Sequence, residues 1–247
     1  MTRLRYPLFA TLIGLCLWQA MIWITGAPHF ILPSPWRVAT TGFESRALIA
    51  EHALVTGTEV ILGLVIGAVL GALTAIQLAA SAKLARLAMP LLVFTQAVPV
   101  FALAPILTLW FGYGMASKVV MAVLIIYFPV TASFYDGLIR VTPALLDLAK
   151  TMGARDAQIM LRIKIPHALP SLASGLKLAA VYAPIGAVIG EWVGSSKGLG
   201  YLMLLANGRA KIDLMFASLI ALALLTVVLH KSVSALANRM DNISPTG

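Results

Sequence analysis

The chain has 247 residues, of which 60% are hydrophobic and 11% are charged, and its mean hydropathy is +0.95. Soluble domains are about 45–50% apolar and about 25% charged, so this composition excludes a soluble enzyme, a disordered protein and a secreted disulfide scaffold. Eighteen Lys and Arg residues against nine Asp and Glu give a net charge of +9. A membrane chain collects such an excess in cytoplasmic loops, so we expect a bilayer and no nucleic acid as its surroundings.

The length and hydropathy predict an all-α membrane protein with about six transmembrane helices, since each needs about 20 apolar residues. The first apolar run follows a basic head of Arg3 and Arg5. A signal peptide is the competing interpretation, but the run is long and Thr25-Gly26-Ala27 is a poor cleavage site. We expect a single transmembrane domain over residues 1–247, with spans at about 8–25, 54–79, 88–111, 118–138, 175–193 and 214–236.

The segments between the spans have their own signals. Pro33 and Pro35 predict a turn that cannot continue a helix, and residues 36–53 are typical of a short interfacial amphipathic helix. Residues 194–211 are rich in glycine and predict an outer loop. With the N-terminus inside, the outer segments hold only six of the 18 basic residues, which favours both termini in the cytoplasm: Arg37, Arg46, Lys118, Lys197, Arg209 and Lys211.

Small residues recur every four positions in the second span, at Gly63, Gly67, Gly71 and Ala75. This spacing places them on one helix face, where another helix backbone can approach closely. Prolines inside the later spans free backbone carbonyls that neighbours or a cavity must satisfy.

The most informative segment is the polar loop at residues 142–166. Thr142 can cap a helix that begins at Pro143, and Gly153 predicts its end. A second short helix is expected at about 156–163, ended by Pro166 and Pro170. The first helix has an apolar side that predicts a docking surface, made of Leu145, Leu146, Leu148, Ala149 and Met152.

This loop resembles the EAA loop of the permease subunits of bacterial binding-protein-dependent ABC importers. Asp147-Leu148-Ala149, Gly153 and Ile163-Lys164-Ile165-Pro166 keep the spacing of that loop, although Asp147, Leu148 and Ile165 depart from its usual residues. Further segments look like the subgroup that imports nitrate, sulfonates, taurine and pyrimidine precursors of thiamine: Leu32-Pro33-Ser34-Pro35, Ala104-Pro105-Ile106-Leu107, Trp110-Phe111-Gly112, Phe128-Pro129 and Gly198-Leu199-Gly200-Tyr201. Glu191-Trp192-Val193-Gly194 looks most like the pyrimidine branch.

The resemblance implies a MetI-like, type I ABC importer permease fold in the bacterial inner membrane. It implies a periplasmic binding protein that delivers a small polar organic solute, either a pyrimidine or thiamine precursor or a sulfonate- or nitrate-type anion. It also implies ABC ATPase subunits that supply the energy, with ATP and Mg bound by the ATPase and no cofactor on this chain. The coupling helix that contacts the ATPase would comprise Ala144, Leu145, Leu146, Asp147, Leu148, Ala149, Met152, Gly153 and Ala154.

Motifs for covalent chemistry are missing from the sequence. It has no phosphate-binding loop, its four histidines have no metal-ligand spacing, and no base accompanies a candidate serine nucleophile. We therefore expect no catalytic residue and no metal site. An alternating-access path lies between two halves, and the polar loop is not repeated within the chain. A second permease copy or a homologous permease is therefore required, and we predict a homodimer. The alternative is an ion-coupled secondary transporter or channel, which would need midplane charges or an inverted repeat.

A few polar residues fall within the spans. Gln96 and Glu191 are the candidates for the translocation path, because a polar group at membrane depth usually faces a cavity or a partner. For Glu191 the alternative is an interfacial carboxylate paired with Lys197 or with loop amides. Glu59 is expected at the interface, and Asp136 and Arg140 are expected to form a surface pair.

Overall fold

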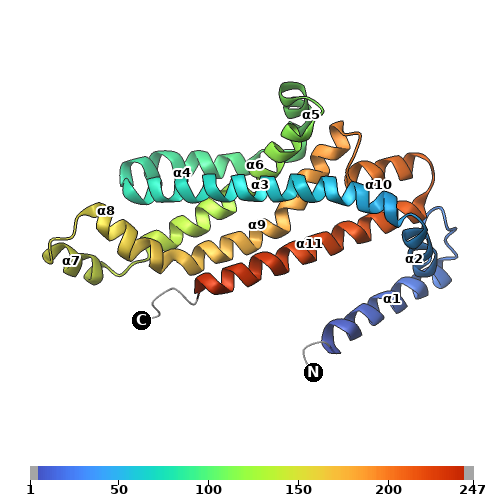
Figure 1. Cartoon of the computed structure of the whole chain (residues 1–247), viewed down its shortest axis with the longest axis horizontal. Coiled ribbons are helices and arrows are strands. Elements are labelled where there is room, and N and C mark those ends of the chain that lie inside the picture. The colour runs from blue at the N-terminus through green and yellow to red at the C-terminus, as the bar shows by residue number, and fades with distance from the viewer. Residues whose placement is uncertain (1–4, 242–247) are drawn as a thin grey trace.

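The computed structural model describes residues 5–241, and all regular structure within them is helical (Figure 1). Arg3 of the predicted basic head lies outside the described residues. The helices are α1 (Arg5–Thr25), α2 (Pro35–Glu44), α3 (Arg46–Ala80), α4 (Ala82–Ala97), α5 (Val100–Phe111), α6 (Met115–Ile139), α7 (Pro143–Thr151), α8 (Asp156–Ile159), the π-helical turn η2 (Met160–Lys164), α9 (Ile165–Gly194), α10 (Leu199–Gly208) and α11 (Ile212–Asp241).

Four of the described helices are long and apolar enough to cross a membrane: α3, α6, α11 and the continuous helix Asp156–Gly194. The predicted span at 88–111 is not one helix, because α4 and α5 meet at a bend of 95°. The bend falls at Val98-Pro99, where proline cannot donate a backbone hydrogen bond to α4. With the α4–α5 pair counted as one broken span and the shorter apolar α1 counted as another, the number of transmembrane spans is compatible with the six predicted.

Three local expectations were wrong. The interfacial helix expected at 36–53 ends at Glu44, and Arg46 already begins α3. The loop expected at 194–211 contains a partly buried helix, α10. Pro166 does not end the second loop helix, because η2 inserts a wider turn in which the Ile165 N–H bonds to the Met160 carbonyl, and α9 continues to Gly194.

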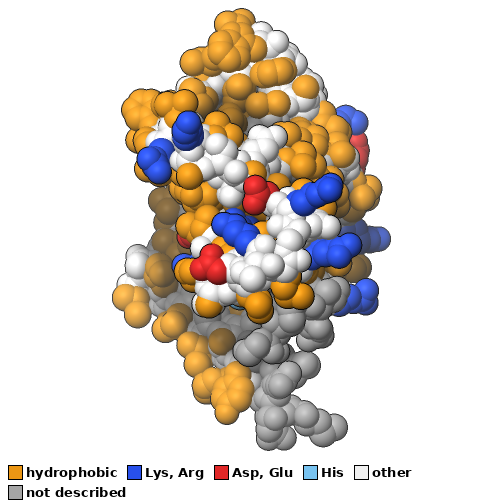
Figure 2. Space-filling model, turned by 90° about the vertical axis from the view of Figure 1, so that its left-hand side faces the viewer, with side chains coloured by type: hydrophobic (Ala, Val, Ile, Leu, Met, Phe, Trp, Pro, Cys, Tyr) orange, Lys and Arg blue, Asp and Glu red, His pale blue; other side chains and the backbone are white. Residues whose placement is uncertain are grey.

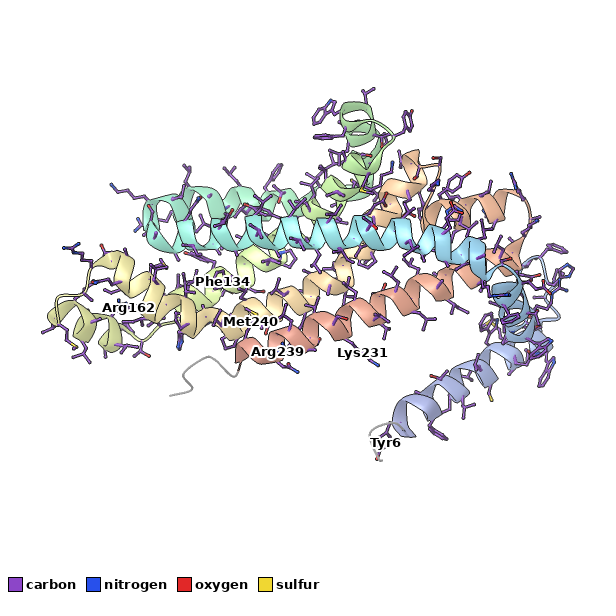
Figure 3. All side chains as sticks on the ribbon, in the orientation of Figure 1. Tyr6, Phe134, Arg162, Lys231, Arg239 and Met240 are labelled. Atoms are coloured by element: carbon purple, nitrogen blue, oxygen red, sulfur yellow. The ribbon has the colours of Figure 1, made fainter. Side chains whose placement is uncertain are left out.

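The predicted close helix contact on α3 is confirmed. A Cβ atom at Gly63 would lie 2.5 Å from the Ala122 Cβ, and one at Gly67 would lie 2.6 Å from Ile126 Cγ1. Farther along, Gly71 faces Val130 of α6. The two helix surfaces therefore interlock every four residues, and next to them Phe134 is buried against Ala75, Leu138 and Ala168 (Figure 3).

A second backbone contact joins α6 and α9 at Gly186. A Cβ atom there would lie 2.6 Å from the Ala122 Cα and 2.9 Å from its nitrogen, which are backbone atoms that cannot rotate away. We expect Gly186→Ala to force α6 and α9 apart and to destabilise the protein by about 1–3 kcal/mol or more. The thermal unfolding midpoint of the detergent-solubilised protein measures this effect. Gly208→Ala is the control, since nothing lies within 4 Å of that position, and an equal shift for both variants would contradict the prediction.

The long helices run side by side and give the molecule two ends (Figure 1). Helices α7 and α8 lie at one end, which we call the loop end, and α2 and α10 lie at the other, which we call the α10 end. Helix α1 diverges from the bundle. It packs on α2, and Trp18 lies 5.6 Å from the Phe216 ring, while much of its apolar surface stays exposed, as at Leu12, Leu17 and Trp23.

Candidate functional site

The polar loop forms a short helix that ends in a left-handed glycine turn. Gly153 has φ +81°, its N–H bonds to the Lys150 carbonyl at 2.9 Å, and the Ala154 N–H bonds to the Ala149 carbonyl at 3.0 Å. These two bonds define a Schellman motif, in which the residue with positive φ is usually glycine. Thr142 occupies the N-cap position, as predicted, but its side chain makes no capping hydrogen bond.

The helix presents an apolar surface away from the bundle. Leu145, Leu148 and Met152 are 44%, 56% and 79% exposed, whereas Ala149 is buried against the rest of the chain and Leu146 is half-buried. Lys and Arg side chains surround this end of the molecule (Figure 2), among them the exposed Lys83, Arg86, Lys150, Arg155 and Arg162. An exposed apolar surface within a basic rim is the arrangement expected of a docking site.

Gln96 lies beside a cavity. Its exposed side chain, near the end of α4, lines a space of about 500 Å³ with residues of α6 and α9. Aromatic and hydroxyl groups share this lining, namely Phe128, Ser133 and Tyr182. Pro129 of α6 also lines it, so at least one of the predicted helix-interior prolines borders a cavity.

Glu191 lies elsewhere, buried near the α10 end. Its Oε1 accepts a hydrogen bond from the Thr56 hydroxyl at 2.6 Å. Its Oε2 accepts from the backbone N–H groups of Gly200 at 2.5 Å and Tyr201 at 3.4 Å. Lys197 pairs instead with the exposed Glu51 at 3.2 Å. For an interfacial Glu191, the sequence left two partners open, Lys197 and the loop amides. The structure contains the contact with the backbone amides and not the one with Lys197.

Two α3 side chains complete this arrangement, which we call the Glu191 cluster. His52 Nδ1 accepts from the Gly198 N–H at 2.9 Å, and Thr56 Oγ1 accepts from the Leu199 N–H at 2.8 Å. The first N–H groups of a helix have no partner within the helix, so His52, Thr56 and Glu191 together cap the start of α10. Sequence reasoning missed His52 and Thr56, although their spacing of four on a helix is a signal that they share a face.

The glycines of this segment make room for the carboxylate. Gly198 has φ +106°, and a Cβ atom there would lie 2.2 Å from the Glu191 Cδ. A Cβ atom at Gly200 would lie 2.8 Å from the Glu191 Oε2. The Gly198-Leu199-Gly200 sequence is therefore explained by close approach to Glu191.

Lys118 is also buried, although it was counted among the outer basic residues. Its Nζ donates to the carbonyls of Tyr113, at 2.6 Å, and Gly194, so its charge satisfies the carbonyl end of α9. Glu59 is 2% exposed and lies near Lys118 and Glu191, and its Oε2 has no hydrogen-bond partner. Glu59 was expected at the membrane interface, and the structure adds that the contacts of α3, α6 and α9 bury its side chain inside the protein.

Known proteins identify the class of this chain. Residues 63–242 match the family described as "Binding-protein-dependent transport system inner membrane component". A "Probable ABC transporter permease protein" of Haemophilus influenzae is 49% identical, covering 96% of this chain and 97% of its own. The formylaminopyrimidine transport permease protein ThiX of Halalkalibacterium halodurans is 35% identical, covering 94% and 93%. A solved structure of the MetNI methionine ABC transporter, inward facing, has a TM-score of 0.62 at 21% identity, covering 78% of this chain and 94% of that one.

The chain therefore belongs to the family of binding-protein-dependent ABC transporter permeases and has the MetI-like fold. It is the multi-pass membrane subunit of an importer, and the ATPase of such a system is a separate subunit. MetI-like permeases work with ABC ATPase subunits and a substrate-binding protein. The predicted class and fold are confirmed.

Proposed function

We propose that two copies of this chain form the translocation path for a small polar organic solute, delivered by a periplasmic binding protein. The solute we propose is a pyrimidine precursor of thiamine. The support is the relative named for formylaminopyrimidine transport, at 35% identity over 233 residues. Relatives named for sulfonate and taurine transport are 28% and 26% identical, so a sulfonate-type anion is the second candidate.

The loop end is proposed to be the ATPase contact and to lie in the cytoplasm, with both termini on that side. The single observation that carries this assignment is the apolar surface of α7, exposed and held by the glycine turn at Gly153. We propose that residues 144–149 and 152–154 bind to the surface of the ATPase. In this proposal the ATPase binds ATP and Mg, and this chain binds no cofactor. The cluster of exposed cations at that end supports the orientation, since basic residues favour the cytoplasmic side.

The coupling loop and the Glu191 cluster lie at two ends of one helix. The stretch Asp156–Gly194 is 39 residues long, or about 58 Å at 1.5 Å per residue. We propose that a movement of α7 driven by the ATPase reaches the α10 end through this helix. Glu191 would then act on the path by holding α10, while Gln96 would line the path directly.

Two features of the single copy support the homodimer that we propose. The Gln96 cavity is lined by α4, α5, α6 and α9 and is open to the surface, and much of the apolar surface of α1 is exposed among the described residues. A second copy would supply the opposite wall and bury α1. A larger apolar groove of about 640 Å³ between α3 and α11 lacks polar side chains beyond Thr58 and Ser232, so it is a poorer candidate for a polar solute.

Reconstitution tests the proposal. We expect proteoliposomes that contain this chain, its ATPase and a loaded binding protein to take up radiolabelled formylaminopyrimidine only when ATP is present. Omitting the ATPase is the control. Uptake that survives without ATP in an ion gradient would favour the alternative, an ion-coupled secondary transporter or channel. ATP-driven uptake of an aliphatic sulfonate in place of the pyrimidine would overturn the proposed solute.

A further inference from the structure

A small polar pocket lies between α6 and α9, on the loop-end side of the Gln96 cavity. It has a volume of about 230 Å³ and is lined by Ser133, Asp136, Arg140, Ser171 and Ser174. The three α6 residues are spaced by three and four positions and the two α9 residues by three, so each set shares one helix face. Every lining residue is polar, within a chain that is 60% hydrophobic.

The two charges in this pocket are available to a ligand. Asp136 and Arg140 were expected to pair, yet no ion pair joins them among the side chains that the structure describes, in contrast to Arg37–Asp213 and Lys197–Glu51. Both side chains are exposed rather than buried against the protein. Opposite charges one helical turn apart, without a contact between them, leave one acceptor and one donor group side by side.

The serines are placed by close contacts between the helices. A Cβ atom at Gly175 of α9 would lie 3.0 Å from the Ser133 Cβ, and one at Gly137 of α6 would lie 2.6 Å from the Ser171 Cβ. Ser133 and Ser171 therefore lie at close contacts between the two helices. Ser174 donates to the Pro170 carbonyl at 3.0 Å, which leaves its oxygen free to accept.

Ser133 belongs to both cavities, because it lines the 500 Å³ space beside Gln96 as well as the polar pocket. The two spaces thus adjoin along the same α6–α9 groove. From the middle of α6 toward the loop end, the lining changes from aromatic groups and an amide, at Phe128, Tyr182 and Gln96, to serines and charges.

We propose that this pocket is a second solute-binding site on the translocation path, occupied before release at the loop end. We call this site the station. This inference rests on the proposed function. The Asp136 carboxylate accepts from an exocyclic amino group, and the Arg140 guanidinium donates to a ring nitrogen or carbonyl. Because the two charges offset one another, the station suits an uncharged amino-substituted nitrogen heterocycle. An aliphatic sulfonate would face the Asp136 carboxylate without a donor to offer it.

Variants of the charged residues test the station in the complete transporter. We expect Asp136→Asn and Arg140→Gln each to lower ATP-driven uptake of formylaminopyrimidine by about tenfold, the cost of one charge-assisted hydrogen bond. ATP hydrolysis stimulated by the binding protein should stay within about twofold of wild type, because neither residue lies on α7. Lys231→Gln on α11 is the matched control, an exposed cation that lines neither cavity, and it should transport normally.

Thiol labelling tests occupancy while Asp136 and Arg140 stay in place, so the result does not depend on whether their variants fold. The only cysteine is Cys16, so Cys16→Ser gives a background for Ser174→Cys. We expect excess formylaminopyrimidine to slow modification of the new thiol in the purified complex, and an aliphatic sulfonate to leave it unchanged. Ser232→Cys on α11, outside both cavities, should react at the same rate with or without solute.

The outcomes separate the two proposals. If the wild-type complex transports formylaminopyrimidine, but both charge variants transport normally and the Ser174→Cys thiol is not protected, the station is wrong and the proposed function stands. If the wild-type complex does not transport the pyrimidine, the proposed function itself fails. Protection by the sulfonate but not by the pyrimidine would overturn the proposed specificity.

Discussion

Replacing Gly153 with valine is expected to detach the ATPase while leaving the permease folded in the membrane. The residue has φ +81°, a conformation that costs a residue with a Cβ about 1–2 kcal/mol, and more for a β-branched one. No atom lies within 4 Å of the position where its Cβ would be, so the substitution creates no clash inside this chain. The strain and the added bulk act on the turn that presents α7, and a misplaced α7 cannot fit its partner.

Co-purification measures this effect. We expect the yield of ATPase recovered with tagged Gly153→Val to fall by about tenfold or more, as for a loss of about 1.4 kcal/mol in binding, with unchanged permease yield. Gly153→Asn is the informative companion, because asparagine tolerates the left-handed region and should retain more ATPase. Gly208→Ala, at another open glycine with ordinary φ, should retain all of it. Normal ATPase recovery and transport by Gly153→Val would remove the turn from the coupling contact.

Replacing Glu191 with alanine is expected to abolish most transport without weakening ATPase binding. The change leaves the N–H groups of Gly200 and Tyr201 without their acceptor in a buried site, and it leaves the Thr56 hydroxyl only the His52 carbonyl, 3.3 Å away. Each unsatisfied buried group costs about 1–3 kcal/mol, so the start of α10 should come away from α3 and α9. Because α7 lies at the other end of the molecule (Figure 1), the ATPase contact should be unaffected.

We expect uptake by Glu191→Ala to fall by about tenfold or more, with ATPase co-purification within about twofold of wild type. Glu191→Gln keeps one acceptor oxygen and should recover part of the transport. Glu51→Ala is the matched control, since its pair with Lys197 joins the same two segments with side chains 59% and 61% exposed, and such surface pairs contribute about 0–1 kcal/mol. Unchanged uptake by Glu191→Ala would show that α10 need not be held for transport.

Several elements could be predicted from local sequence because their causes are local. The Thr142-Pro143 start and the Gly153 stop of α7 depend on backbone preferences of single residues. The α3 contact at Gly63, Gly67 and Gly71 depends on a spacing that any helix converts into one face. The apolar spans follow from composition, because a bilayer admits only helices of sufficient length.

Other elements were mispredicted because distant residues determine them. The segment at 194–211 is rich in glycine and was expected to be a loop, yet Leu199–Gly208 is helical because His52, Thr56 and Glu191 supply the partners that its first N–H groups lack. Glu59 was expected at the membrane interface and Lys118 was counted in an outer segment, but the sequence did not show that packing of α3, α6 and α9 buries both side chains. The polar pocket on α6 and α9 joins residues up to 41 positions apart in the chain, and no motif connects them.

The sequence by itself determined the membrane class, the family and the glycine turn that ends α7, since hydropathy, spacing and the conformational freedom of glycine act within a few residues of one another. Only the tertiary structure decided what the buried polar groups do. A carboxylate in an apolar segment can face a path, a lipid headgroup or a helix end, and the free energies of these arrangements depend on which donors the fold brings within about 3 Å. For Glu191 those donors belong to α3 and α10, and the carboxylate therefore holds two helices together.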